Sequence, residues 1–492
     1  MPLNAARSTI HTLLLGLALL SALATPALAQ SSALPPEVEA ALARAKVPHD
    51  AVSLLVVDAE GKQSARLSHR ADQPMNPASV MKLVTTYAGL DLLGPAFTWS
   101  TPVFVEGAVR EGTLYGNLHI RGQGDPKLVT ERLWLLLRRV QSLGVKTIAG
   151  DIVLDNRAFE VAAQDPGAFD GEPLRPYNAS PQALLINFKS VVMTFVPDVT
   201  SGLAQISYEP PLAGVQLPPS VPLTLSATGS AGDCGDYRSL LKADFSDPLR
   251  IRFNGSLAAS CGEKVWPVAY ADPLSYGARA VEGLWRDMGG QLAGKVREGQ
   301  LPTLAGAAPA MMTRPVFEMV SPTLLEVVRD INKFSNNVMA QQLFLTLSLN
   351  QPTGTAASFA ASRERLQAWW RERMGGNEVP VIIKGSGLSR GERISAQALA
   401  RLLQNAYGSP NMSELMSSLP IRGVDGTLRR ARVTGPGSAH LKTGSLRDVS
   451  AVAGYVLGTR GKRYVLVAIV NHANAGAARA AIDALVEWTA KD

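Results

Sequence analysis

Between residues 74 and 94 the hydrophobic positions recur three and four residues apart. This spacing predicts an apolar α-helix, which the Gly94-Pro95 pair ends. Upstream, residues 51–69 contain alternating or continuous apolar runs that are broken at Glu60-Gly61, a pattern that predicts two strands joined by a turn. The apolar positions of the predicted helix are Val80, Leu83, Val84, Tyr87, Leu90 and Leu93.

The pattern changes after this helix. Over residues 98–306, short strand-like runs broken by Gly and Asp surround one helical stretch, and residues 196–230 are strand-like and rich in proline. We therefore expect a β-rich insert over 98–306, with a subdomain near 166–270 that contains both cysteines.

Helical spacing returns at residues 321–334 and 337–349. We expect the main domain to be discontinuous and to combine residues 30–97 with residues 307–492. It is expected to belong to the α/β (α+β) class.

Near the C-terminus, residues 439–446, 449–458 and 463–472 resemble consecutive antiparallel strands. The last predicted helix has an apolar stripe, which we expect to pack on this sheet, although such a stripe also suits peripheral contact with a membrane. The stripe is formed by Ala478, Ile482, Leu485 and Val486.

The first residues have the pattern of a secretory signal. Arg7 precedes an apolar run at residues 12–23, and Ala27 and Ala29 form a small-x-small cleavage site. We expect a signal peptide over residues 1–29 and a mature protein in the periplasm; an uncleaved anchor is the alternative. The apolar run is too short to span a bilayer comfortably.

Composition and charge restrict the class of protein and the partners that can be expected. The 492 residues are 46% hydrophobic and 18% charged, as in globular proteins with two or three domains. The net charge of +7 suits contact with anionic polymers or membrane surfaces, but the chain has no basic run with interleaved aromatic residues, so nucleic acid is not expected as a partner.

Only two cysteines occur, Cys234 and Cys261, and in an exported protein such a pair usually forms a disulfide. No C-x-x-C motif or histidine cluster accompanies them, so no metal site is expected.

Ser79 and Lys82 lie three residues apart, so a helix would place both side chains on one face. A serine hydroxyl is a weak nucleophile that needs a base, and a lysine serves as that base only when burial or another cation lowers its pKa. The S-x-x-K motif alone is weak, because Ser239 and Lys242 match it too.

Two further motifs follow in a fixed order. Ser335-Asn336-Asn337 is an S-x-N motif between two predicted helices, and Lys442-Thr443-Gly444 is a K-T-G motif on a predicted strand. S-x-N also recurs at 348–350 and 409–411, whereas K-T-G occurs once. The order S-x-x-K, S-x-N, K-T-G is typical of serine enzymes that recognise penicillin.

The whole chain after the signal resembles the class C low-molecular-mass penicillin-binding proteins, which are exported D-alanyl-D-alanine carboxypeptidases and endopeptidases. The likeness includes the long insert and the runs at 121–128, 148–159, 385–390 and 423–428. It implies a transpeptidase-like domain, an antiparallel sheet of about five strands flanked by helices, with peptidoglycan peptides as substrates, β-lactams as covalent inhibitors and no cofactor. The oligomeric state stays open.

Two positions depart from the family pattern. Lys384 precedes Gly385-Ser386-Gly387 where an acidic residue is usual, and Ser445 follows the K-T-G motif where threonine is common. The first change alters the charge of the loop, and the second keeps a hydroxyl group.

The resemblance implies that Ser79 attacks the carbonyl between two D-alanines, that Lys82 takes its proton and that Ser335 relays this proton to the leaving amine. It also implies an oxyanion hole formed by the backbone N–H groups of Ser79 and Ser445. The implied substrate-binding residues are Asn337, Lys442, Thr443, Ser445, Asp155 and Arg390.

Two other functions stay open. Gly387-Leu388-Ser389-Arg390-Gly391 matches the G-x-S-x-G elbow of α/β-hydrolases, and Asp425 or Asp448 and then His472 follow in the required order. However, the next helix is expected only near Ser395, which is too late for an elbow. The other alternative is a non-catalytic cell-wall-binding or β-lactam-sensing protein of the same fold.

A class A β-lactamase would need a deacylating glutamate followed four residues later by asparagine. No glutamate between the S-x-N and K-T-G motifs has that neighbour, so deacylation of penicillin is expected to be slow. The glutamates considered are Glu364, Glu372, Glu378, Glu392 and Glu414.

Overall fold

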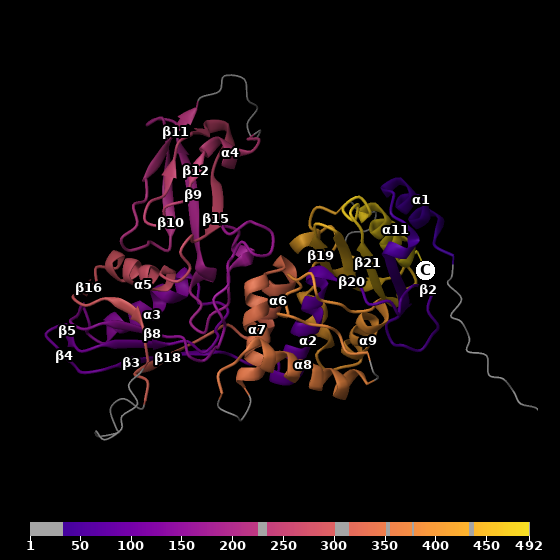
Figure 1. Cartoon of the computed structure of the whole chain (residues 1–492), viewed down its shortest axis with the longest axis horizontal. Helices are drawn as coiled ribbons and strands as arrows, with labels where there is room; N and C mark the ends of the chain where they lie inside the picture. The colour runs from indigo at the N-terminus through magenta and orange to yellow at the C-terminus, as the bar shows by residue number, and fades with distance from the viewer. Residues whose placement is uncertain are drawn as a thin grey trace, which may run out of the picture.

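The computed structural model describes residues 33–224, 234–300, 314–350, 355–375, 378–431 and 437–491. The predicted signal peptide, residues 1–29, lies outside these residues. Figure 1 shows the molecule with a group of helices in the middle, the sheet of β19–β21 on one side and the strands of the insert on the other.

The central sheet has five antiparallel strands and joins the two ends of the chain. This confirms the expected five-stranded antiparallel sheet, in which the N-terminal strand β1 pairs with the late strand β21. The strand order is β19 (Ala439–Leu446), β20 (Val449–Leu457), β21 (Arg463–Asn471), β1 (Val52–Asp58) and β2 (Leu67–His69).

Both faces of this sheet are covered because its strands are apolar on both sides. Val52, Leu54 and Val56 face α1 (Pro36–Ala45) and α11 (Arg479–Ala490), whereas Leu55 belongs to the core on the opposite face. The apolar stripe of α11 therefore packs on the sheet, as the sequence predicted. The opposite face carries α2 (Lys82–Leu93), α6 (Leu324–Phe334), α7 (Asn337–Leu349), α8 (Phe359–Met374), α9 (Ala396–Tyr407) and α10 (Met412–Ser418).

Helix α7 is buried on all sides over residues 337–348, since its sequence is apolar around most of its circumference. It also fixes the insert. Gln342 Nε2 donates to the carbonyl oxygens of Gly124 and Gln182, at 3.2 and 3.0 Å. One end of α7 carries the S-x-N motif, so the insert is anchored to the helix that begins at this motif.

The insert consists of three larger sheets, the two-stranded pair β12 (Ala243–Asp244) and β13 (Arg252–Phe253), and the helices α3 (Thr130–Ser142), α4 (Tyr237–Leu241) and α5 (Tyr276–Asp287). The first sheet has the order β17 (Val296–Glu298), β8 (Ile152–Asp155), β6 (Leu118–Arg121), β3 (Ser100–Val105) and β18 (Phe317–Val320). The second has the order β16 (Gln291–Leu292), β7 (Thr147–Ile148), β5 (Thr113–Tyr115) and β4 (Ala108–Arg110).

The third sheet of the insert projects upward in Figure 1, and Cys261 lies between two of its strands in the sequence. Its order is β14 (Leu257–Ala258), β11 (Ser220–Thr224), β10 (Leu203–Glu209), β9 (Ser190–Asp198) and β15 (Lys264–Ala269). The β-rich character matches the sequence pattern, but α5 was not anticipated. The exact domain boundaries stay a prediction, and β18 pairs with β3 although it lies after residue 306.

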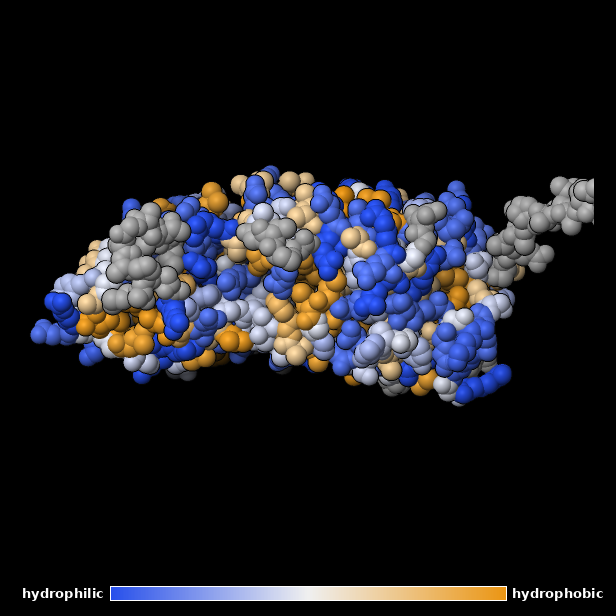
Figure 2. Space-filling view, turned by 90° about the horizontal axis from the view of Figure 1, so that it is seen from below, coloured by the Kyte–Doolittle hydropathy of each residue, from blue (hydrophilic) through white to orange (hydrophobic). Residues whose placement is uncertain are grey.

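Figure 2 shows the face that is seen from below in Figure 1, where hydrophobic residues gather near the middle and toward the insert, among hydrophilic ones. Within the described part of the chain, no helix has both the length and the apolar character that crossing a membrane requires.

Candidate active site

Ser79 lies in a short 3₁₀ turn, η2 (Ala78–Met81), that leads directly into α2. The predicted helix thus begins at Lys82, three residues later than Ser79, because the first turn is wound more tightly. The two side chains still meet: Lys82 Nζ lies 2.8 Å from Ser79 Oγ.

Lys82 is fully buried, and its Nζ contacts three oxygens. Besides Ser79 Oγ, these are Asn337 Oδ1 at 2.6 Å and the carbonyl oxygen of Ser386. A neutral amine has two N–H donors and one lone pair. The amide and the carbonyl can accept both donors, which turns the lone pair toward the Ser79 hydroxyl.

Burial, followed by the nearby charge of Lys442, holds the pKa of Lys82 well below its usual value. Both effects disfavour the charged form of a lysine. The geometry and the electrostatics therefore suit Lys82 to accept a proton from Ser79.

Lys442 is the second buried lysine of the site. Its Nζ donates to Ser335 Oγ at 3.0 Å and to the Thr443 carbonyl at 2.8 Å, and burial lowers its pKa to about 7. Ser335 ends α6 in a left-handed conformation, with φ at 57°. Asn336, and not Ser335, caps α7 through Met339 N, so capping does not occupy the Ser335 hydroxyl.

Glycines let two segments approach the turn that carries Ser79. A Cβ on Gly444 would lie 2.4 Å from the Pro77 carbonyl oxygen, and a Cβ on Gly387 would lie 2.0 Å from that of Ala78. At such distances, a side chain at either position would force the neighbouring backbone to shift. The Gly444 contact brings β19 against the Ser79 turn, as an oxyanion hole from the amides of Ser79 and Ser445 requires.

A buried acid, Glu392, lies beside the site, although from the sequence it was considered only as a deacylating glutamate, for which it lacks the required asparagine. Glu392 is fully buried, and its Oε1 accepts the backbone N–H groups of Ile383 at 3.2 Å and Lys384 at 3.4 Å. Its Oε2 is buried without a hydrogen-bond partner among the described residues. Burial raises its pKa to about 7, although these N–H groups and Lys82 act in the opposite direction.

Two cavities meet at Ser79, and Ser335 and Ser445 also line both of them. The larger has a volume of about 950 Å³ and is lined by Asn337, among others. The smaller has a volume of about 560 Å³ and is lined by Thr443. Thr443 Oγ1 lies 2.8 Å from Thr427 Oγ1, a residue of the 423–428 run to which no role was assigned from the sequence.

Of the predicted substrate-binding residues Asp155 and Arg390, only Arg390 lies at a cavity that Ser79 lines. Arg390 lines the larger cavity, but Asp155 lies in a different one, where Arg157 contacts its carboxylate at 2.8 Å and Arg121 at 3.5 Å. The acid of the insert that does line the larger cavity is Asp170. Asp170 does not follow a strand. Its position depends on how its loop folds, and the sequence of that loop has no periodic pattern from which the position could be predicted.

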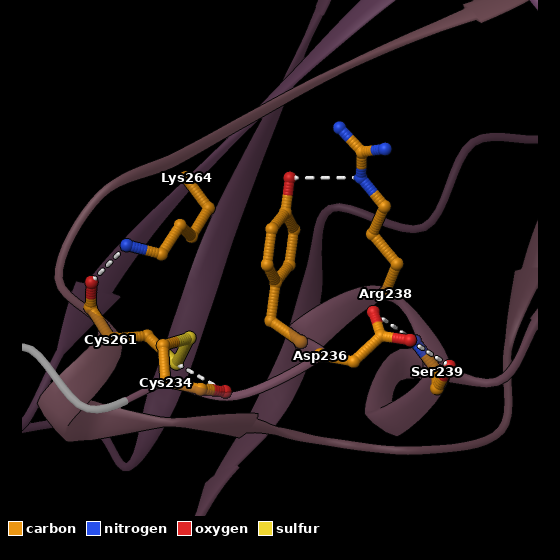
Figure 3. Close-up of a disulfide and its surroundings, with 7 residues drawn as sticks. Cys234, Asp236, Arg238, Ser239, Cys261 and Lys264 are labelled. Atoms are coloured by element: carbon orange, nitrogen blue, oxygen red, sulfur yellow. Dashed lines mark hydrogen bonds between the residues drawn. A yellow bond between two sulfur atoms is a disulfide. The ribbon is translucent and has the colours of Figure 1, made fainter. Parts of the chain in front are cut away.

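The other two candidate nucleophile motifs, at Ser239 and Ser389, lack the structural surroundings that a nucleophile needs. Figure 3 shows the Ser239 hydroxyl hydrogen-bonded to Asp236. Lys242 follows the end of α4 in a left-handed conformation. Ser389 Oγ accepts the Gly391 N–H at 3.1 Å, and the following helix, α9, begins only at Ala396. The antiparallel central sheet is also not that of an α/β-hydrolase, so that alternative is wrong.

Cys234 and Cys261 lie at bonding distance, with their Cα atoms 4.7 Å apart (Figure 3). Lys264 Nζ donates to the Cys261 carbonyl at 2.6 Å. Their placement fits the predicted pairing. Among the described residues, no group of three or more His, Cys, Asp or Glu side chains is arranged to hold a metal ion.

Comparison with known proteins identifies the family. The model of the D-Ala-D-Ala carboxypeptidase 3 (S13) family matches residues 34–492. The chain belongs to this family. It is 25% identical to D-alanyl-D-alanine carboxypeptidase DacB of Haemophilus influenzae over 410 residues, which are 82% of this chain and 81% of that protein.

A second relative is the D-alanyl-D-alanine carboxypeptidase of Actinomadura sp., 28% identical over 93% of this chain and 85% of that protein. The crystal structure of penicillin binding protein 4 from Haemophilus influenzae has the same fold. It superposes with a TM-score of 0.69 at 23% identity and covers 92% of this chain and 99% of that one. The S13 chain is thus a serine peptidase of the penicillin-recognising fold.

Proposed function

We propose that this S13 protein hydrolyses the peptide bond that follows a D-alanine in peptidoglycan stem peptides, through an acyl-enzyme on Ser79. The observation that carries the proposal is the environment of Lys82, a fully buried amine with Nζ 2.8 Å from Ser79 Oγ. Its relatives named D-alanyl-D-alanine carboxypeptidases support the same substrate class.

In the first half of the reaction, Ser79 Oγ attacks the D-alanyl carbonyl carbon and its proton passes to Lys82 Nζ. The C–N bond then breaks, and the proton moves through Ser335 Oγ to the leaving amine. Ser335 suits this relay because Lys442 Nζ donates to its hydroxyl at 3.0 Å. In the second half, water attacks the ester, which releases the acid and returns the proton to Ser79.

Stabilisation of the oxyanion is assigned to the backbone N–H groups of Ser79 and Ser445, each donor being worth about 3–4 kcal/mol in comparable sites. Asn337 is proposed to bind the amide of the acyl part. Lys442, with Thr443 and Ser445, is proposed to bind the carboxylate of the leaving residue.

We propose that β-lactams acylate Ser79. The name of the Haemophilus influenzae penicillin binding protein, which says that this relative binds penicillin, supports the proposal. Deacylation is expected to be slow. Glu392 is the only deacylating candidate that we find in the described site, and its Oε1 is engaged by backbone N–H groups of the 383–384 segment rather than by Ser79.

The protein is proposed to act in the periplasm after removal of residues 1–29, with a disulfide between Cys234 and Cys261. An oxidising compartment agrees with a covalent pair at this site. The Cα separation of 4.7 Å lies within the range that disulfides adopt.

Intact-protein mass spectrometry after incubation with a penicillin, followed by peptide mapping, tests the proposal. We expect a stable one-to-one adduct on the Ser79 peptide, together with release of D-alanine from a pentapeptide. A folded protein that forms no adduct and releases no D-alanine would overturn it in favour of a binding or sensing role.

A further inference from the structure

The two cavities that meet at Ser79 differ in which motif residues line them. Asn337, proposed to bind the acyl part of the substrate, lines only the larger cavity, and Thr443, proposed to bind the carboxylate of the leaving residue, lines only the smaller. If Ser79 attacks the bond between these parts, the leaving group must enter the cavity of about 560 Å³.

This volume exceeds what a terminal D-alanine needs. Pockets of about 300–1,000 Å³ enclose ligands of drug size, whereas D-alanine has only six non-hydrogen atoms. A cross-linked substrate is different, since its leaving group is a whole second stem peptide. That peptide is anionic, with a carboxylate beside the new amine and further carboxylates along its chain.

The smaller cavity has positively charged residues in its lining, which are complementary to such an anionic peptide. Arg430, which follows the turn η6 (Gly426–Leu428), and Arg479, the first residue of α11, both line it and are exposed. Neither side chain makes an ion pair or hydrogen bond with another described residue. The one acid of the lining, Asp483, is paired with Arg422, which Glu487 also contacts, so the lining carries two arginines against a single acid.

We propose that Arg430 and Arg479 form a subsite for the leaving peptide of a cross-link and thereby direct the enzyme toward endopeptidase cleavage. This inference rests on the proposed function. The subsite adds no chemical step: Ser79 still forms the ester, the D-alanyl C–N bond breaks, and the second peptide departs with the amine and its proton. The two guanidinium groups bind its carboxylates, a preferred partner of arginine.

The experiment compares two substrates with the mature full-length protein. One is a monomeric muropeptide with a pentapeptide, from which D-alanine is released; the other is a D-alanyl-cross-linked dimer, whose cleavage is followed by liquid chromatography and mass spectrometry. The readout is the ratio of kcat/KM for the dimer to kcat/KM for the monomer. We expect the R430E/R479E variant to lower this ratio by about tenfold or more, since juxtaposed like charges are strongly unfavourable.

The R430K/R479K variant should keep most of the wild-type ratio, because it retains both positive charges. The R44E/R371E variant is the matched control, with the same change of net charge on α1 and α8, and its ratio should not change. An unaltered ratio in R430E/R479E, or a wild type that cleaves only the monomer, would overturn the subsite. A wild type that cleaves neither substrate and forms no penicillin adduct would instead overturn the proposed function.

Discussion

Glu392 accepts the backbone N–H of Lys384 at 3.4 Å, so a buried carboxylate contacts the position where the family pattern led us to expect an acidic side chain. The neighbours of Lys384 in the loop contact the catalytic helix: the carbonyl oxygens of Gly385 and Ser386 accept hydrogen bonds from Thr85 and Lys82 of α2. Glu392 thus positions the loop that orients Lys82.

The E392Q variant separates the charge of this residue from its shape. The glutamine carbonyl oxygen can still accept the N–H groups of Ile383 and Lys384, so the loop keeps its place. The negative charge that Glu392 carries above its pKa of about 7 is lost, however, and that charge acts to raise the pKa of Lys82. We therefore expect the acid limb of the pH profile for acylation by a chromogenic β-lactam to move to lower pH.

The E392A variant should behave differently, because it removes the acceptor as well as the charge and leaves a cavity. Acylation should then slow at every pH, with a lower melting temperature. E364Q, on the exposed side of α8, is the control and should match the wild type. An E392Q profile that coincides with the wild type, or that moves to higher pH, would contradict the electrostatic role of Glu392.

Replacement of Lys82 by arginine tests whether this residue acts as a base. A guanidinium keeps its proton at any working pH, so it cannot take the proton of Ser79. We expect the acylation rate to fall by about 10²–10⁴-fold, the usual contribution of a general base. Stopped-flow acylation measures the rate, and circular dichroism checks the fold. A K82R variant that is acylated within threefold of the wild-type rate would exclude Lys82 as the base.

A glycine is needed at position 444 because the Ser79 turn leaves no room for a Cβ atom there. An alanine Cβ would lie 2.4 Å from the Pro77 carbonyl oxygen, so β19 or the Ser79 turn must shift. Since a misplacement of about 1 Å can lower a rate by about 100-fold, we expect G444A to slow acylation by about 10–100-fold. G476A is the control, because a Cβ at Gly476 meets nothing within 4 Å. Equal rates in both variants would show that the close approach is unimportant.

The parts of the molecule that sequence patterns predicted are those with local, periodic signals. The strands of the central sheet and the helices α2, α6, α7 and α11 follow from apolar spacing, whereas α1, α8 and α10 were not predicted. The three motifs are separately recognisable. Ser79, Lys82, Asn337, Ser335 and Lys442 could thus be grouped from the order of their motifs along the chain, and hydrogen bonds link them into two sets.

What could not be predicted depends on contacts between distant segments. Glu392 is buried because its loop packs on α2, and a single acidic residue in a polar run gives no sign of this. Thr427 reaches Thr443 only because η6 lies beside β19. The resemblance pointed to Asp155, which ends a clear strand, whereas Asp170, the acid that lines the larger cavity, stands in a loop without a periodic pattern.

The last prediction concerns these two acids. Asp170 lines the larger cavity and accepts hydrogen bonds from Tyr177 Oη at 2.9 Å and Asn178 Nδ2 at 2.8 Å, which fix its carboxylate. Although burial alone would raise the pKa of Asp170, these hydrogen bonds lower it, so the carboxylate is charged at neutral pH. It is therefore suited to bind an ammonium group on the side chain of the acyl part.

We expect D170N to raise KM for a stem peptide with a free side-chain amine. Exposed charge pairs contribute about 0.2–1 kcal/mol, so the increase should be at most about fivefold, with kcat unchanged. An analogue with an acetylated amine should show no difference between D170N and the wild type. D155N should instead lower the melting temperature, since its buried carboxylate pairs with Arg157 and Arg121, and should leave KM unaltered. A rise of KM in D155N but not in D170N would restore the original assignment.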